Sequence, residues 1–425
     1  MTQQLHFEIS SVRTAADVPI VIHVAGAKPM HPVTIHAELA DHFGVTWVSH
    51  ARFAADGRGR VDLERDAPIS GTYSGVDSMG LFWSMTSDDP TPTVTRTRDA
   101  LHVKLRAESD NTTHAMASVQ RLVVPDGVRA RDVREQGLVG TFFQPPGAGP
   151  HSAVITLSGS SGGLYEPPAA LLAGHGYAAF ALAYFGFESP PRELVRIPLE
   201  YFETAIQWLR SQPAIRGDAI GVVGSSRGGE LALLLGATFP RIRVVVAVAP
   251  SHVMQAGTET GLKASRPAWS FRGKPLPFVP RVPPSAPIDK KPLALTPMFL
   301  TAMADEAAVE RAVIPVEKIT GPVLLLSPKD DQMWPSTMMA DKVMQRLQRC
   351  QHPFLFDHRT YDGAGHMVST FVPHLPATCT GRRHPVRDVV TAFGGDPKDT
   401  ARARADGWER IITFLGASLG ASPES

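Results

Sequence analysis

The stretch AIGVVGSSRGGELALLLGATFP, residues 219–240, decides the fold of this chain. An apolar run typical of a buried strand leads into the G-x-S-x-G turn of residues 224–228, and a run rich in leucine and alanine, typical of a buried helix, follows. Strand, turn and helix in this order predict a nucleophile elbow, which holds Ser226 on a strained turn at the amino end of the helix. The helix end would stabilise negative charge that develops beside this serine.

The alternative interpretation of this stretch is a glycine-rich turn with an incidental serine. We favour the catalytic interpretation, because the strand and the helix stand in the places that an elbow requires. The elbow also needs small residues at Gly224 and Gly228, where side chains would collide with the neighbouring strand and helix. An acid and a base elsewhere in the chain would support it.

Length, charge and cysteine content bound the class of protein. A chain of 425 residues is too long for one ordinary core, so two domains are expected. The formal net charge of +1 predicts neither nucleic acid nor a membrane as partner. Cys350 and Cys379 form neither a disulfide framework nor a zinc-binding pattern, so no metal site is predicted.

The sequence carries no targeting or membrane pattern. The first residues, MTQQLHFEIS, lack a basic segment followed by an apolar one, so no signal peptide is expected. No run approaches the roughly 18 apolar residues of a transmembrane helix. These features predict a cytoplasmic enzyme, and they predict no particular oligomeric state.

Two patterns divide the chain. Residues 1–128 contain short β-rich runs separated by turns, which predict an immunoglobulin-like β-sandwich. Residues 129–425 alternate strand-like and helix-like runs, including a predicted helix over residues 194–209, which indicates a mostly parallel sheet covered by helices. We therefore expect the α/β class, with an α/β-hydrolase catalytic domain after the sandwich. The aromatic stretch at residues 71–83 is expected to pack in the sandwich and between domains rather than to contact substrate.

An insertion, about residues 251–312, interrupts the alternation. Its part from residue 266 to 297 is proline-rich and irregular, and it falls between two predicted strands of the sheet. An insertion there would lie over the carboxyl-terminal edge of the sheet, so we expect a cap over the active site. A disordered excursion is the alternative.

The rest of a triad follows the elbow in the order serine, acid, histidine that an α/β-hydrolase uses. The turn SPKDD follows a buried strand and supplies Asp330 and Asp331, of which we choose Asp331 as the acid that orients the histidine. A role in the turn alone is the alternative for both. The turn DGAGH, after the next strand, ends in His366, the predicted base. His252 is the competing histidine, but it precedes the acid and breaks the order.

Acyl transfer also needs N–H groups that stabilise an oxyanion. The backbone amide of Arg227, directly after the nucleophile, is one predicted donor. The second is expected from the loop GSSGG, residues 159–163, which follows a strand as the H-G-G-G motif of esterases does. We choose the backbone amide of Ser160, with Ser161 as the alternative, and a tight turn without a chemical role is the other interpretation of this loop.

With these motifs in place, the chain resembles the type I acyl-CoA thioesterases and the bile acid-CoA:amino acid N-acyltransferases over nearly its whole length. In the motif around Ser226, an arginine stands where this family more often has a lysine, and in the acid turn the second aspartate corresponds to the triad member. The motifs are DHFGVTW at 41–47, GTY at 71–73, MGLFW at 79–83, LLAGHGYAAFALAY at 171–184, SRGGE at 226–230, DDQMW at 330–334, GAGH at 363–366 and GGDP at 394–397.

The resemblance implies acyl transfer from a coenzyme A thioester through an acyl-enzyme. Members with a cysteine nucleophile can pass the acyl group to an amine such as glycine or taurine, and members with a serine mainly pass it to water. Because Ser226 is a serine, the resemblance implies a thioesterase with a small-molecule acyl thioester substrate and no separate cofactor. Transfer to an amine or alcohol, or hydrolysis of a specialised ester, is the alternative, since residues 256–297 match the family poorly.

Overall fold

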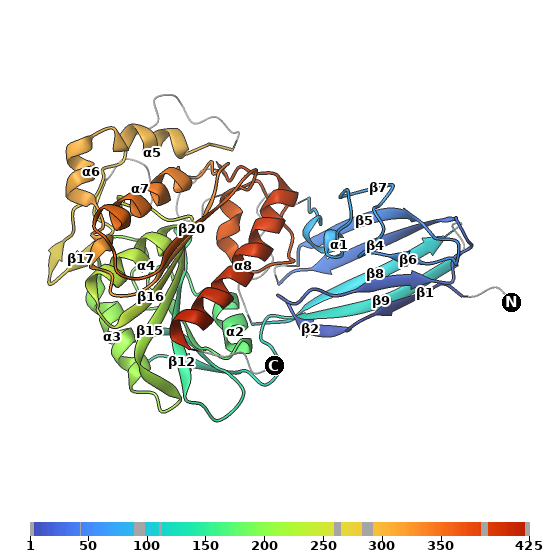
Figure 1. Ribbon diagram of the computed structural model, residues 1–425, viewed down its shortest axis with the longest axis horizontal. Coiled ribbons are helices and arrows are strands. Elements are labelled where there is room, and N and C mark those ends of the chain that lie inside the picture. Colours follow the sequence, from blue (N-terminus) through green and yellow to red (C-terminus); the bar gives the residue numbers. More distant parts are fainter. Residues whose placement is uncertain are drawn as a thin grey trace.

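The computed structural model describes residues 4–42, 44–88, 98–109, 113–258, 265–282, 292–383 and 390–420. These residues form two parts of unequal size, a β-sandwich at one end and a larger α/β part at the other (Figure 1). Phe43 of the DHFGVTW motif, and residues 259–264 and 283–291 of the predicted insertion, lie outside the described residues.

The N-terminal part consists of two sheets whose buried side chains meet in one core. Buried and accessible side chains alternate along β5 (Thr46–Ala54), as the two-residue period of a strand requires, and Trp47 and Phe53 point inward. The order in the larger sheet is β2 (Arg13–Ala15), β9 (Thr113–Leu122), β8 (Leu101–Ser109), β4 (Pro32–Ala40), β5, β7 (Ser70–Gly71), and in the smaller sheet β1 (His6–Ile9), β3 (Ile22–Ala25), β6 (Val61–Asp62).

The larger part is organised around an eight-stranded sheet in the described chain. Its first three strands in space are joined by antiparallel pairs, and every later neighbouring pair is parallel. The parallel strands bring their carboxyl ends to one edge, where α/β sheets bind ligands. The strand order is β10 (Arg129–Val133), β11 (Val139–Gln144), β13 (Ala178–Ala183), β12 (His151–Leu157), β15 (Ile215–Ser225), β16 (Ile242–Val248), β19 (Val323–Pro328), β20 (Phe356–Tyr361).

Helices cover both faces of this sheet. On one face, α3 (Leu199–Arg210), α4 (Arg227–Thr238) and α7 (Ser336–Arg349) bury their apolar side chains in one core cluster. On the other face, α2 (Pro167–Gly174) and α8 (Pro397–Leu419) belong to a cluster that continues into the sandwich. Figure 1 shows these two helices between the sheet and the sandwich. The predicted α/β-hydrolase fold with an N-terminal β-sandwich is therefore confirmed.

The predicted helix over residues 194–209 is wrong at its start, because α3 begins at Leu199. Pro198 is extended, with φ −73° and ψ 131°, and a residue that precedes a proline disfavours helical backbone. The chain just before the helix instead forms β14 (Ile197–Pro198), which pairs with β17 (Trp269–Phe271) of the insertion.

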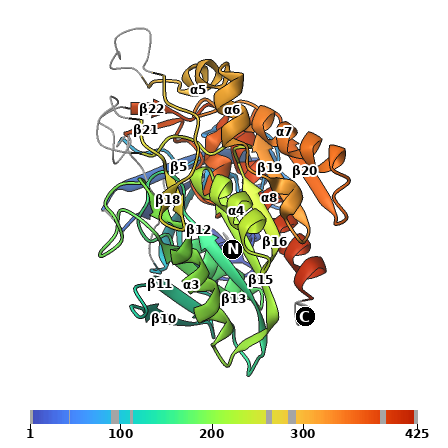
Figure 2. The same ribbon diagram turned by 90° about the vertical axis from the view of Figure 1, so that its left-hand side faces the viewer.

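The described part of the insertion between β16 and β19 is built from short elements. They are β17, β18 (Lys274–Pro275), α5 (Thr296–Met303) and α6 (Glu306–Ala312). The stretch expected to be irregular thus contains a small antiparallel pair of strands. Figure 2 shows α5 and α6 beyond the ends of the sheet strands, on the side where β15 leads into α4.

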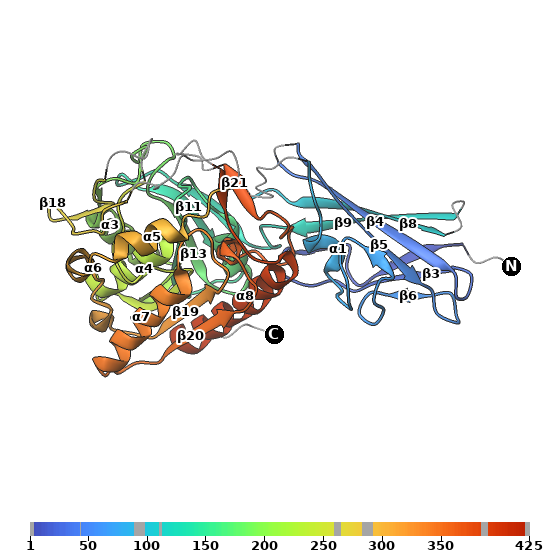
Figure 3. The ribbon, with the colours of Figure 1, turned by 90° about the horizontal axis from the view of Figure 1, so that it is seen from above.

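The two parts are joined by a shared apolar core and by hydrogen bonds. Asp17 of the sandwich accepts a hydrogen bond from Trp408 Nε1 at 2.8 Å, and its Oδ2 lies 2.7 Å from His175 Nε2. In the aromatic stretch, the carbonyl of Trp83, at the end of α1 (Gly80–Trp83), accepts from the Ala377 amide at 2.8 Å. Seen from above, α8 lies next to the sandwich (Figure 3). The sandwich therefore contacts the segments that complete the site.

Candidate active site

Ser226 stands on the turn between β15 and α4. Its φ of 55° and ψ of −119° are unusual for a residue other than glycine, and this is the strained backbone of a nucleophile elbow. A Cβ on Gly224 would collide with the Gly228 carbonyl, and a Cβ on Gly228 would lie 2.5 Å from the Ser158 carbonyl oxygen. Both positions therefore require glycine, for the reason the sequence suggested.

A row of hydrogen bonds joins Ser226, His366 and Asp331. His366 Nε2 lies 3.0 Å from Ser226 Oγ, and its Nδ1 lies 2.9 Å and 3.0 Å from the two carboxylate oxygens of Asp331. All three side chains are buried. Ser336 Oγ donates to Asp331 at 2.7 Å, and the Met333 amide donates at 2.9 Å. The carboxylate is thus fixed against the imidazole, whose other nitrogen can accept the serine proton.

The structure separates the residues between which the sequence left a choice. Asp330 is exposed, and its Oδ2 accepts a hydrogen bond from the Gly395 amide at 2.9 Å. The ring of His252 has a pKa lowered to about 4, chiefly by burial. Asp331 and His366 are the residues that the fold brings to Ser226.

The loop of residues 159–163 lies against the nucleophile. A Cβ on Gly159 would be 3.2 Å from Ser226 Cβ, so the loop backbone passes directly beside the serine. Ser160 borders the cavities on both sides of Ser226, whereas Ser161 borders one of them. The Arg227 amide belongs to the first turn of α4, where amides have no acceptor within the helix. The residues of both predicted donors therefore lie beside Ser226, and their role as oxyanion donors stays a prediction.

Beside the elbow, Arg227 and Glu230 form a buried ion pair that the motifs did not reveal. Arg227 Nη1 donates to Glu230 Oε2 at 2.8 Å, and Nη2 donates to the Gln255 carbonyl at 3.1 Å. Trp269 Nε1 donates to Glu230 Oε1 at 2.7 Å. Burial raises the pKa of Glu230 to about 7, although the Arg227 charge opposes that rise. The sequence signal for this ion pair was an arginine and a glutamate three positions apart in an otherwise apolar helix.

One cavity, of about 50 Å³, lies between Ser226 and the insertion. We call it the apolar chamber, because apolar side chains such as Met298, Phe299 and Trp334 line most of it. Arg227 also borders it, but the guanidinium is engaged by Glu230.

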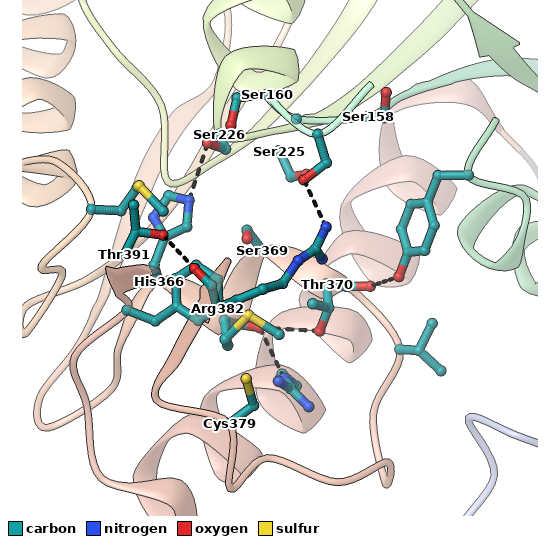
Figure 4. A pocket seen from close by; sticks show the side chains of 18 of the residues that line it. Ser158, Ser160, Ser225, Ser226, His366, Ser369, Thr370, Cys379, Arg382 and Thr391 are labelled. Carbon is teal, nitrogen blue, oxygen red and sulfur yellow. Dashed lines mark hydrogen bonds between the residues drawn. The ribbon is translucent and has the colours of Figure 1, made fainter. Parts of the chain in front are cut away.

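A second cavity, of about 150 Å³, opens on the other side of Ser226 (Figure 4). We call it the arginine chamber, because Arg382, Arg383 and Arg404 all line it. Trp47 of the sandwich lines it too, so the N-terminal part contributes to the site. Sequence reasoning missed these residues. Trp47 lies in the DHFGVTW motif, which signalled the family but not this position.

Two family models match the chain. The model described as "BAAT / Acyl-CoA thioester hydrolase C terminal" matches residues 197–421, and "Acyl-CoA thioester hydrolase/BAAT N-terminal region" matches residues 17–135. The chain belongs to this family of acyl-CoA thioester hydrolases and BAAT acyltransferases. The predicted resemblance, and the prediction of an enzyme of this family, are confirmed.

Similar proteins match over almost their full length. Acyl-coenzyme A thioesterase 1 of Mus musculus is 33% identical over 99% of this chain and 98% of its own. The human protein of the same name is 32% identical, over 96% of this chain and 95% of its own. The peroxisomal succinyl-coenzyme A thioesterase of Mus musculus is 30% identical, over 96% of both chains. Across the described residues, no helix is long and apolar enough to cross a membrane.

Proposed function

We propose that this enzyme hydrolyses acyl-CoA thioesters through an acyl-enzyme on Ser226. The observation that carries the proposal is the row of hydrogen bonds from Ser226 Oγ through His366 to Asp331, set on a strained elbow between two cavities. The family membership and the names of the relatives support coenzyme A as the thiol carrier.

In the first half-reaction, His366 Nε2 takes the Ser226 proton while Oγ attacks the thioester carbon. The amides of Arg227 and Ser160, with Ser161 as the alternative to Ser160, stabilise the oxyanion. The C–S bond then breaks, and His366 gives its proton to the departing thiolate, which leaves as the free thiol. Asp331 keeps the imidazole in the required tautomer and stabilises its protonated form.

In the second half-reaction, a water molecule activated by His366 attacks the ester carbonyl and releases the free acid. An oxygen ester on serine is less reactive toward amines than a thioester on cysteine, so water is the proposed acceptor. The coenzyme A is part of the substrate, and no separate cofactor or metal is proposed. Neither nucleic acid nor a membrane is a proposed partner. We also propose a cytoplasmic location for this enzyme, although its relatives include mitochondrial and peroxisomal proteins.

The test is a panel of acyl-CoA thioesters, with free thiol measured continuously and products identified by mass spectrometry in the presence of millimolar glycine or taurine. We expect free acid from the wild type, and some amide from Ser226→Cys. Predominant amide from the wild type would replace the thioesterase proposal by the second candidate, an acyltransferase. Cleavage of simple esters without any thioester would support an esterase instead.

A further inference from the structure

The arginine chamber contains a buried cation that the proposed chemistry does not use. Arg404 extends from α8 and is only 3% exposed. Its Nε donates to the Met367 carbonyl at 2.9 Å, and its Nη1 donates to the Pro376 carbonyl at 3.0 Å. The other terminal nitrogen, Nη2, is buried and has no hydrogen-bond partner among the described residues. Because a buried N–H without a partner is costly, this nitrogen is a candidate ligand contact.

The charges around Arg404 favour an anion. Burial lowers the pKa of the guanidinium to about 10, so it is still protonated at neutral pH. Within the described chain no carboxylate pairs with it, and the chamber lining includes no aspartate or glutamate there. Arg382 and Arg383 line the same space. A buried charge is expected to be neutralised by a partner, and here a ligand can supply that partner.

The position of Arg404 selects one kind of anion. Its Nε donates to the carbonyl of Met367, the residue directly after His366, and Arg404 lines the same cavity as Ser226. The phosphates of coenzyme A are separated from the sulfur by an uncharged arm of about a dozen bonds, roughly 15 Å when extended. A carboxylate at the far end of a five-carbon acyl group lies only about 5 Å from the thioester carbon. The acyl group is therefore the better match for the buried cation.

We propose that the enzyme prefers thioesters of short dicarboxylic acids, and that Arg404, assisted by Arg382, binds the distal carboxylate in the arginine chamber. This inference rests on the proposed function. The reaction is unchanged: Ser226 Oγ replaces sulfur on the acyl carbon, the thiol leaves with the proton, and water releases a dicarboxylic acid. Arg382 lies beside the oxyanion loop, since its Nη2 donates to Ser161 Oγ at 3.3 Å. A simple alkyl acyl group would instead favour the apolar chamber.

The experiment compares two acyl groups of equal length on two carriers. The substrates are glutaryl-CoA and pentanoyl-CoA, and the matching pantetheine thioesters, which lack phosphates. We expect the wild-type kcat/KM to be at least about 10-fold higher for glutaryl than for pentanoyl on either carrier, the effect of one charge-assisted hydrogen-bonded contact. An equal or higher kcat/KM for pentanoyl would overturn the inference.

Variants assign the preference to its residues. Arg404→Gln and Arg382→Gln should each lower the glutaryl-to-pentanoyl ratio, by about 10-fold for Arg404. Arg402→Gln, exposed on the same helix, should keep the wild-type ratio. If these arginines had a purely structural role, their variants would lower kcat/KM equally for both substrates. The glutaryl-to-pentanoyl ratio would then be unchanged, which would overturn the inference. The inference would also be overturned if the variants changed kcat/KM for the coenzyme A thioesters relative to the pantetheine thioesters, and not for glutaryl relative to pentanoyl. If Arg404→Gln does not fold, Arg382→Gln carries the same test.

A binding measurement separates this inference from the proposed function. The thioethers S-(4-carboxybutyl)-CoA and S-pentyl-CoA have equal length and cannot be hydrolysed, so calorimetry with the wild type reads binding alone. Tighter binding of the carboxylate form supports the inference even if no thioester is turned over, in which case only the proposed function fails. Equal binding overturns the inference while hydrolysis of any thioester keeps the proposed function.

Discussion

Arg227 and Arg404 are both buried, at 4% and 3% exposure, and they line the two chambers on opposite sides of Ser226. They differ in their partners. Arg227 is paired with the Glu230 carboxyl group at 2.8 Å, whereas the hydrogen bonds of Arg404 in the described structure all go to uncharged backbone carbonyls. A buried cation with its own carboxylate belongs to the scaffold, and a buried cation without one is available to a ligand.

The hydrogen bonds of the Arg227–Glu230 pair show that Arg227 has a structural role, because they join the nucleophile helix to the insertion. Gln255 and Trp269 come from the insertion, and both bind the Arg227–Glu230 pair at the start of the nucleophile helix. The apolar chamber is therefore held in place by an internal ion pair. The arginine chamber is bounded instead by α8, by the β21 (Gly381–Arg383) segment and by Trp47 of the sandwich.

The largest expected effect tests whether both chambers serve one nucleophile. Ser226→Ala should lower kcat for glutaryl-CoA and pentanoyl-CoA alike by about 10⁴-fold or more, because the attacking oxygen is lost. Thiol release measures the rates, and circular dichroism should show an unchanged fold. Residual turnover of one substrate, or an acyl adduct found by intact mass on the variant, would mean that the two chambers do not share Ser226.

The next effect separates two adjacent carboxylates. Asp331→Asn should lower kcat by about 10⁴-fold for both acyl groups, since the His366 tautomer is no longer fixed. Asp330→Asn is the matched control and should cost less than about 3-fold, because its exposed carboxylate binds only the Gly395 amide in the described structure. Steady-state kinetics of the two variants decides, and the reverse order of losses would move the acid to Asp330.

The sequence predicts the features that depend on short motifs and on their order along the chain. Ser226, Asp331 and His366 each follow a buried strand in a short turn, so their types and order were visible before their distances were known. The start of α3 was mispredicted because Pro198 permits no helical turn before it. The positions of Trp47 and Arg404 at the site could not be predicted from the sequence, because the sandwich strand and the closing helix meet the site only through tertiary packing.

A smaller effect concerns the ion pair of the apolar chamber. The pKa of Glu230 is raised to about 7 in the folded protein, above its ordinary 4.5, so the native state retains this proton more readily than the unfolded chain. The contribution to stability is thus fully present below pH 4.5 and is lost as the pH rises through about 7. Between these values the slope is about 1 kcal/mol per pH unit.

Glu230→Gln should remove that slope, as measured by urea unfolding at a series of pH values. Glu409→Gln, exposed on α8, is the matched control and should keep the wild-type slope. Parallel curves for Glu230→Gln and the wild type would show that folding leaves the pKa of Glu230 at its ordinary value. The Arg227–Glu230 pair would then be fully charged at neutral pH, as a surface salt bridge is, although it is buried.

The smallest effect asks whether the sandwich shapes the arginine chamber. Trp47 and Phe53 are both buried side chains of β5, but only Trp47 lines the chamber, and its Nε1 donates to Asp41 Oδ2 at 3.1 Å. Trp47→Phe and Phe53→Leu should each lower the free energy of unfolding by about 1–2 kcal/mol, through a lost hydrogen bond and lost packing. Only Trp47→Phe should also change kcat/KM for glutaryl-CoA by a few-fold, because it alone alters a side chain that lines the arginine chamber. If the two variants change stability and kinetics in parallel, the sandwich acts on the site only through its own stability, and the Trp47 side chain does not affect how the arginine chamber binds substrate.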